Sequence, residues 1–381
     1  MTLFGEVYFF IWLVILSIPA IVLGIKEKNI KYYGFFASLV FIGFAVWEKP
    51  IGAIYLVGFC VYQLVLANLM LALISSKGRR KSIFWCFIIL SVLPLVIFKV
   101  SALFENAILG FIGISYLTFK SLQVIIEIYD QLIKEIKVFD YMYFMLFFPS
   151  ISSGPIDRSR RFAQDIEIPK SRGEYLDGLG DGLMYICQGL VYKFVFAGLL
   201  YQALNLVDNY SIWFASLGYM YCYGFYLFFD FAGYSRMAVG VSYIFAIDTP
   251  DNFNKPFISI DIKEFWDRWH ISLSHWFRDF VFSRFMMESI RGKWFKDKLT
   301  GASIGFLINM LLMGLWHGLS VSYILYGLYH GILLAITEIY QKKSKFYKKH
   351  KKDRLYKFVS WFITFNLVMF GFYIFQENLL K

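Results

Sequence analysis

The sequence predicts an all-α polytopic membrane protein, and two observations carry that prediction. Of its 381 residues, 59% are hydrophobic and only 17% are charged, whereas soluble domains usually contain roughly 25% charged residues. The hydrophobic residues also form runs close to the about 20 residues that a helix needs to cross a bilayer. These runs cover 8–25, 51–74, 82–98, 183–206, 212–229, 301–319 and 358–375. We expect one integral-membrane domain over residues 1–381.

The N-terminus and the cysteines argue against a secreted, disulfide-linked chain. The first run, 8–25, has neither the basic region nor the small-residue cleavage site of a secretory signal, so it is expected to remain as a span. The cysteines all lie in hydrophobic runs without CxxC spacing, which argues against disulfides and against a metal site. They are Cys60, Cys86, Cys187 and Cys222.

The basic residues are concentrated in short loops. The formal net charge is +11, and Lys and Arg cluster at 26–31, 77–81, 133–137, 158–161 and 342–354. Such clusters mark the cytoplasmic loops of membrane proteins, so the charge does not indicate a nucleic-acid partner. With 26–31 inside, the N-terminus lies outside; with 342–354 inside, the run 358–375 carries the chain end to the outside.

The chain becomes irregular after its first third. Segments 113–130 and 147–162 are hydrophobic but are interrupted by Gly, Pro, Ser and charged residues. Irregular backbone at membrane depth is tolerated only where it is buried in protein or lines a water-filled cavity. Gly154-Pro155 predicts a turn, after which Asp157 and Arg158 either hold an entrance open or are solvated loop charges.

The most polar stretch between hydrophobic runs is FWDRWHISLSHWFRDFVF at 265–282. If it is helical, spacings of three and four residues place Asp267, Ser274 and Arg278 on a face shared with His270 or with one another. Trp266 and Trp276 fit equally well an interfacial aromatic belt. The whole stretch could instead be a basic amphipathic helix on the membrane surface.

A second unusual site is MGLWHGLS at 313–320, which places His317 in an apolar span beside Trp316 and Gly318. An ionisable group inside a span is costly and indicates a functional site, although a lone histidine on an apolar face is more often structural. His330 follows 13 residues later, roughly 140° away on a continuous helix at about 100° per residue. We therefore expect His275 and His330 to be structural.

Long motifs carry a resemblance to a known family. DNFNKPF, DIKEFWDRWHISLSHWFRDFVF and NMLLMGLWHG resemble the membrane-bound O-acyltransferase (MBOAT) family. GISYLTFKSLQ, FFPSISSGPIDRSRRF and FYLFFDFAGYSRMAVGVSY favour its branch of D-alanyl transfer proteins of Gram-positive bacteria over its alginate O-acetyltransferase branch. The similarity runs over about 113–331; His275 and the somewhat short chain depart from the pattern.

The resemblance implies a fold and a function. The fold is a funnel-shaped bundle of about eleven transmembrane helices with re-entrant and amphipathic helices. The family's invariant histidine falls on His317 and its second site histidine on His270. The implied function, in a Gram-positive cell membrane, is transfer of D-alanine toward lipoteichoic acid. The donor is the 4'-phosphopantetheine thioester of the cytoplasmic carrier protein DltC, with no permanently bound cofactor, and a DltD-like extracellular protein and a small helper peptide are further expected partners.

The implied chemistry suits the residues. Histidine has an unperturbed pKa near 6.5 and can act as the base that deprotonates an acceptor hydroxyl. We assign that role to His317, while His270 orients the acceptor, polarises the thioester carbonyl or binds the acceptor. We expect no Ser-His-Asp nucleophile elbow on this chain, so a serine acyl-enzyme is unsupported and direct transfer is the simpler interpretation. The residues expected to line the substrate tunnel with these histidines are Asp267, Trp269, Ser274, Arg278 and Trp316.

The segment 281–299, here called the basic segment, is the expected landing site of the carrier. Acidic carrier proteins need basic residues around an apolar centre, and methionines adapt well to partners. The expected docking residues are Arg284, Phe285, Met286, Met287, Ile290, Arg291 and Lys298, with Lys293 and Lys296 nearby. The alternative is an amphipathic segment lying on anionic lipid.

Three other functions remain open. The nearest is an MBOAT protein that O-acetylates an exported polysaccharide. A secondary transporter would show inverted repeats and paired broken helices, and the sequence has no such internal symmetry. A purely structural membrane subunit would not explain His317 in its apolar span.

Overall fold

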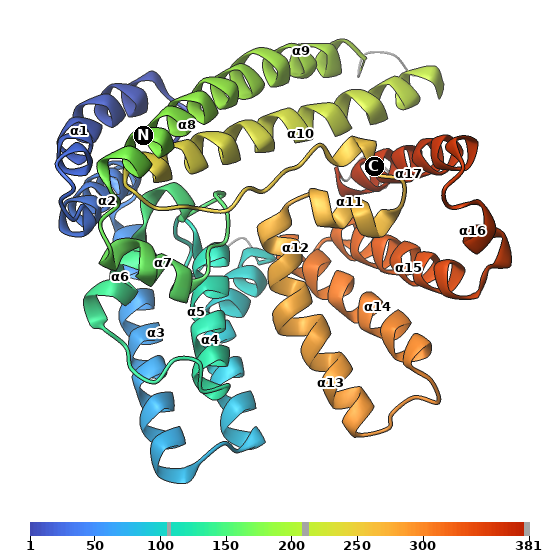
Figure 1. Ribbon diagram of the computed structural model, residues 1–381, viewed down its shortest axis with the longest axis horizontal. Helices are drawn as coiled ribbons and strands as arrows, with labels where there is room; N and C mark the ends of the chain where they lie inside the picture. Colours follow the sequence, from blue (N-terminus) through green and yellow to red (C-terminus); the bar gives the residue numbers. More distant parts are fainter. Residues whose placement is uncertain (105–107, 208–212, 377–381) are drawn as a thin grey trace. The chain divides into compact units, whose positions relative to one another are not determined.

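A computed structural model describes residues 1–104, 108–207 and 213–376, which form two compact units (Figure 1). Unit 1 comprises Met1–Leu190 and Gly233–Pro250, and unit 2 comprises Val191–Ala232 and Asp251–Lys381. Within the described ranges the regular structure is helical, and the only β pairing is an isolated bridge between Phe253 and Trp269. The predicted all-α fold is confirmed.

Unit 1 contains the helices of the N-terminal half. They are α1 (Val7–Ile25), α2 (Lys31–Val46), α3 (Pro50–Lys77), α4 (Lys81–Ala102), α5 (Ile114–Tyr129), α6 (Val138–Leu146), α7 (Ser159–Glu167), α8 (Arg172–Leu190) and the last part of α10 (Trp213–Ile244). Helix α5 packs against α3 and α4 and is buried over almost its whole length. It begins at Gly113, whose φ is 84°, and a Cβ there would lie 2.0 Å from the carbonyl oxygen of Ile151, so only glycine fits this position.

Polar side chains of α5 hold the irregular segment that follows α6. The ammonium group of Lys120 donates hydrogen bonds to the Phe144 carbonyl (2.8 Å) and to Ser150 Oγ (2.9 Å). Gln123 Nε2 donates to the Asp157 carbonyl at 2.8 Å. The irregular backbone is therefore buried in protein, which is one of the two environments, besides a water-filled cavity, where such backbone is tolerated at membrane depth.

Asp157 is part of this core. It is 1% exposed and accepts hydrogen bonds from the Arg158 backbone N–H (2.6 Å) and from the Arg161 guanidinium. The expectation of solvated charges is wrong for Asp157, because an ion pair and a backbone N–H satisfy its carboxylate inside unit 1. The turn at Gly154-Pro155 is confirmed.

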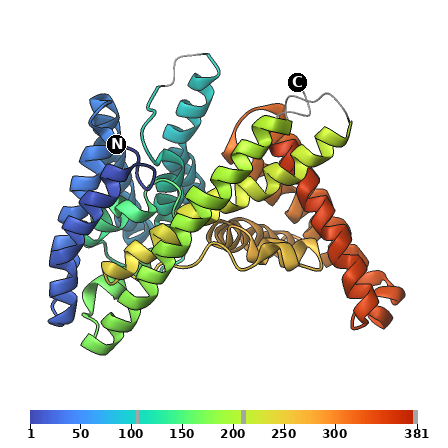
Figure 2. The same cartoon turned by 90° about the horizontal axis from the view of Figure 1, so that it is seen from above.

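Unit 2 contains the first part of α10 and the C-terminal helices. They are a π-helical turn (Val191–Phe196), α9 (Ala197–Val207), α11 (Ile262–Arg268), α12 (Ile271–Phe277), a second π-helical turn (Arg278–Phe282), α13 (Ser283–Arg291), α14 (Lys298–His317), α15 (Val321–Lys343), α16 (Lys345–His350) and α17 (Arg354–Phe375). α14 and α15 form a tight hairpin, and α17, red in Figure 2, packs against α15. A Cβ on Gly327 would lie 2.5 Å from the Met310 carbonyl oxygen, so glycine allows the two backbones of the hairpin to approach.

Seven of the described helices are long and apolar enough to cross a membrane. They cover Val7–Ile25, Pro50–Lys77, Lys81–Ala102, Arg172–Leu206, Lys298–His317, Val321–Lys343 and Arg354–Phe375. Six of these match predicted runs, whereas Val321–Lys343 was missed because tyrosines and His330 dilute its hydropathy. The predicted run 212–229 lies in α10, except for residue 212, which is outside the described ranges. The count of about eleven spans stays a prediction.

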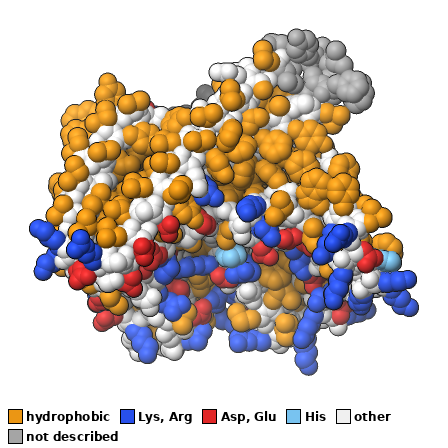
Figure 3. All heavy atoms as spheres, turned by 45° about the horizontal axis from the view of Figure 1, so that its top comes forward, with side chains coloured by type: hydrophobic (Ala, Val, Ile, Leu, Met, Phe, Trp, Pro, Cys, Tyr) orange, Lys and Arg blue, Asp and Glu red, His pale blue; other side chains and the backbone are white. Residues whose placement is uncertain are grey.

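Exposed hydrophobic side chains cover broad areas of the face seen in Figure 3, and charged side chains gather in another part of that face. In α3 they include Ile54, Val57 and Val61, each about half exposed or more. Such continuous apolar surface on long helices is what contact with lipid requires. The chain is a multi-pass membrane protein.

Candidate functional site

The polar stretch 265–282 is interrupted at His270. Helix α11 ends at Arg268 and α12 begins at Ile271, and between them His270 takes a left-handed conformation with φ 43° and ψ 53°. This conformation is uncommon for a residue other than glycine and is often found at functional sites. Asp267 therefore lies on a different helix from Ser274 and Arg278, and a single face shared by all three is wrong; Ser274 and Arg278 remain four residues apart along α12 and the helical turn that continues it.

Residues of the DNFNKPF motif stabilise this interruption. The Ile271 backbone N–H donates to the Asn252 carbonyl at 2.9 Å, and Ser272 Oγ donates to Asn252 Oδ1 at 2.6 Å. The Asn254 N–H donates to the Arg268 carbonyl at 3.0 Å. These bonds replace those that a continuous helix would make around His270. Asn252 was not among the predicted site residues, although it lies in the DNFNKPF motif, which could have indicated a role at the site.

The imidazole of His270 is buried, at 3% exposure, and meets the ring of Phe231 edge-on at a centroid distance of 4.7 Å. Within the described ranges no protein group forms a hydrogen bond with its Nε2. Burial, and secondarily the nearby His317, hold the pKa of His270 well below its usual 6.5. The ring is therefore neutral at physiological pH, with a nitrogen available to a ligand.

His317 is the last residue of α14 and is half-buried. Its ring lies among aromatic rings, at centroid distances of 4.6 Å from Trp316 and 4.9 Å from Phe375. The Trp316 ring in turn lies 6.4 Å from that of His270. The structure thus brings the two predicted catalytic histidines near the same tryptophan, all within unit 2.

His330 lies on α15 and is fully buried among aromatic rings, 4.7 Å from Tyr326 and 5.2 Å from Trp266 by ring centroids. The helix is broken between His317 and Val321, so the angle expected on a continuous helix does not apply. Tyr326 contacts both histidine rings, so His330 and His317 share an aromatic neighbour. Its structural role stays a prediction.

The three tryptophans of the polar stretch are buried, at 7% for Trp266, 5% for Trp269 and 3% for Trp276. An interfacial belt is therefore wrong for Trp266 and Trp276. Trp269 packs on Phe372 (4.7 Å between centroids) and so forms a wall next to His270. Ser274 Oγ donates to the Trp269 carbonyl at 3.1 Å and fixes the same turn.

Two predicted tunnel residues lie on the surface of unit 2. Asp267 is exposed, and Arg278 is exposed and pairs with Asp279 at 3.0 Å. The break at His270 places Asp267 on α11 and Arg278 after the end of α12. Their place in the tunnel stays a prediction.

The basic segment contains α13, whose residues divide into two sets. Met287 and Ile290 are 49% and 50% exposed, and the Arg291 side chain is exposed. Phe285 and Met286 are half-buried and turn toward α14, where Phe285 is close to Gly305 and Met286 to Gly301. Lys298 is exposed at the start of α14, and Arg284 is half-buried. Trp294, which the sequence analysis overlooked, adds an exposed ring to the outward set.

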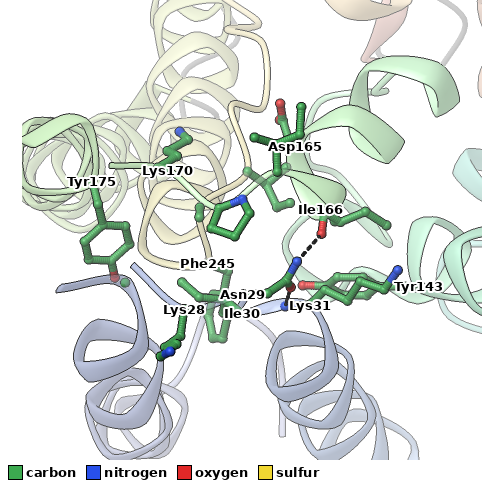
Figure 4. A pocket seen from close by; sticks show the side chains of 15 residues that line it. Lys28, Asn29, Ile30, Lys31, Tyr143, Asp165, Ile166, Lys170, Tyr175 and Phe245 are labelled. Carbon is green, nitrogen blue, oxygen red and sulfur yellow. Dashed lines mark hydrogen bonds between the residues drawn. The ribbon is translucent and has the colours of Figure 1, made fainter. Parts of the chain in front are cut away.

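A separate, small pocket lies in unit 1 (Figure 4). Lys28, Asn29, Tyr143 and Lys170 are among the residues that line it, and Asn29 Nδ2 donates to the Ile166 carbonyl at 2.9 Å. Most of its charged groups are paired: Lys31 with Asp140, Lys170 with Asp248, and Asp165 with Arg161. The first pair joins α2 to α6, the second joins the segment before α8 to the segment after α10, and the third lies within α7, so the pocket is a structural junction. In the described part of the chain no three His, Cys, Asp or Glu side chains are grouped to hold a metal ion.

The chain is similar to known proteins over most of its length. The model of the MBOAT, membrane-bound O-acyltransferase family matches residues 48–376. Teichoic acid D-alanyltransferase of Bacillus subtilis (strain 168) is 42% identical over 388 residues, covering 99% of this chain and 98% of that protein. The protein of the same name from Streptococcus thermophilus is 39% identical, covering 98% and 94%. A probable alginate O-acetylase AlgI of Pseudomonas aeruginosa is 34% identical over 276 residues, covering 70% of this chain and 49% of that protein.

Proposed function

Because the chain belongs to the membrane-bound O-acyltransferase family and is an acyltransferase, we propose that it transfers D-alanine for the D-alanylation of teichoic acid. Relatives named teichoic acid D-alanyltransferase are 37 to 42% identical over nearly the whole chain. The structural observation that carries the proposal is the pair His270 and His317, which both lie near Trp316, at the start of α12 and the end of α14. We further propose lipoteichoic acid as the final acceptor and the cell membrane of a Gram-positive bacterium as the location, with the N-terminus outside.

The donor in this proposal is a D-alanyl thioester on the 4'-phosphopantetheine arm of the carrier protein DltC. A thioester carbonyl is already reactive, so the site must supply placement and a base. A DltD-like extracellular protein and a small helper peptide complete the set of proposed partners. The outward-facing Met287, Ile290 and Arg291 support carrier docking on the basic segment, because apolar side chains and a cation are exposed together there.

The proposed reaction proceeds by direct transfer. The acceptor hydroxyl oxygen attacks the thioester carbonyl carbon while His317 takes the hydroxyl proton. The tetrahedral intermediate then collapses, the carbon–sulfur bond breaks, and the departing thiolate takes the proton from the His317 imidazolium. General base catalysis of this kind contributes about 10²–10⁴-fold.

His270 is proposed to orient the acceptor or to bind the carbonyl oxygen. Its Nε2 makes no hydrogen bond to described protein groups, and an unpartnered polar atom in a buried site is costly unless a ligand satisfies it. Its lowered pKa keeps the ring neutral, so it acts through a hydrogen bond and not through a positive charge. The αL backbone held by Asn252 fixes the direction of the ring.

O-acetylation of an exported polysaccharide is the second candidate. The alginate relatives match 70% of this chain, whereas the D-alanyltransferase relatives match 98 to 99%. The two histidines serve either reaction, so the acyl group must be distinguished by experiment.

The test uses purified protein in nanodiscs and carrier loaded with radiolabelled D-alanine. Teichoic acid, the extracellular partner and the helper peptide are added singly and together, and the label is followed. We expect labelled D-alanine to leave the carrier and to appear on an added acceptor. Acetyl-loaded carrier is the matched control, and transfer of acetyl in preference to D-alanine contradicts the proposal.

A further inference from the structure

Asn309 is a buried amide in the middle of the apolar helix α14. It is 8% exposed, and in the described part of the chain its Oδ1 has no hydrogen-bond partner. Burying an amide without a hydrogen bond is costly, and a polar group inside a span is by default a functional-site candidate. The mechanism above does not use this side chain.

The position of Asn309 connects the docking segment to the base. Gly301, Gly305, Asn309, Met313 and His317 follow one another at intervals of four residues on α14. At about 1.5 Å per residue, Asn309 lies ~12 Å along the axis from His317. At about 100° per residue, the two side chains are ~80° apart around it.

The end of this row that contains Gly301 and Gly305 faces the basic segment. A Cβ on Gly305 would lie 2.9 Å from the Phe282 ring and 3.1 Å from the Phe285 ring, and a Cβ on Gly301 would lie 3.8 Å from Met286. Asn309 is one turn beyond Gly305 in the direction of His317. A donor that starts at the basic segment and ends at His317 therefore passes the turn that carries Asn309.

We propose that Asn309 binds the pantetheine arm of the donor by hydrogen-bonding the second of its two amides, counted from the sulfur. This inference rests on the proposed thioester donor. A carboxamide complements a secondary amide because its oxygen accepts from the N–H and its NH₂ group donates to the carbonyl. In an extended pantetheine arm the sulfur lies about 10 Å from this amide. This length is close to the ~12 Å rise along α14 from Asn309 to His317. Asn309 is thus a positioning residue that places the thioester beside the base.

The test compares two donors on the full-length protein. D-alanyl-pantetheine carries both amides, whereas the D-alanyl thioester of N-acetylcysteamine keeps only the amide next to the sulfur. We expect Asn309→Leu to lower kcat/KM about tenfold or more with the pantetheine donor, because an amide is left unpaired in an apolar site. With the short donor the variant should equal the parent protein.

Ile308→Leu serves as the matched control on the more exposed adjacent position of α14, and it should not alter the ratio between the two donors. Asn309→Ala gives the same comparison if the larger leucine prevents folding. An equal loss with both donors shows that Asn309 only supports packing and overturns the inference, as does an unchanged rate with both. If the parent protein accepts neither these thioesters nor loaded carrier, the proposed function itself fails.

Discussion

The rings of His270 and Trp316 lie 6.4 Å apart by centroids, although one residue immediately precedes α12 and the other lies near the end of α14. Since Trp316 immediately precedes His317, this relationship places both histidines at one site. It depends on the left-handed turn at His270, which Asn252 stabilises.

His317→Gln should abolish D-alanine transfer. Glutamine keeps hydrogen-bonding capacity but cannot accept the hydroxyl proton, so the rate should fall by about 10²–10⁴-fold. Transfer from loaded carrier is measured alongside size-exclusion profiles that verify folding. Near-parental transfer by the folded variant would remove His317 from the role of base.

His270→Gln should lower transfer strongly and also change how stability depends on pH. The folded-state pKa of His270 lies well below 6.5, so below about pH 6.5 the unfolded chain binds a proton that the folded protein refuses. The stability of the parent protein should therefore fall as pH drops from 7 toward 5, and less steeply in the variant. Thermal unfolding of the detergent-solubilised proteins measures both slopes, and identical slopes would contradict the assignment.

Asn252→Ala should reduce transfer although Asn252 is not assigned a contact with substrate. The variant removes the acceptor of the 2.6 Å hydrogen bond from Ser272 Oγ, and so loosens the turn that directs His270. We expect about a tenfold lower kcat with little change in carrier KM, because binding on the basic segment is untouched. A change confined to KM would mean that Asn252 acts in binding.

Met287→Asp and Ile290→Asp should abolish carrier binding in detergent, where anionic lipid is absent. Both side chains are about half exposed on α13, and a charge there disrupts an apolar contact. Ile168→Asp is the matched control, since Ile168 is 70% exposed in unit 1. Arg291→Ala should weaken binding in a salt-dependent way. Undiminished binding by the aspartate variants would move the docking site, most directly to the loop 158–161.

Asp157→Asn should destabilise the protein without changing transfer per folded molecule. The carboxylate is buried and paired with Arg161, and removing its charge should cost about 2 kcal/mol. Glu167→Gln is the comparison, because Glu167 pairs with Lys137 on the surface and its loss should have little effect. The unfolding temperatures of both variants are compared with that of the parent protein. Equal decreases would mean that the buried pair contributes no more stability than the surface pair.

The positions of the spans followed from the sequence because lipid imposes a simple requirement on it. A stretch of about 20 apolar residues satisfies its backbone internally as a helix wherever it packs, so six of the seven long apolar helices match predicted runs. Val321–Lys343 did not stand out, since its polar residues face protein and lower its mean hydropathy.

By itself the sequence determined the all-α membrane class, the family through its long motifs, and His270 and His317 as the candidate pair. Only the tertiary structure decided which neighbours join them. It interrupts the helix at His270, leaves Asp267 and Arg278 on the surface, and buries Asp157 and Asn309. The physical reason is that the hydrophobic pattern of a helix depends only on residues near one another in the sequence. A break such as that at His270 depends on hydrogen bonds from Asn252, in a preceding segment that folds against it.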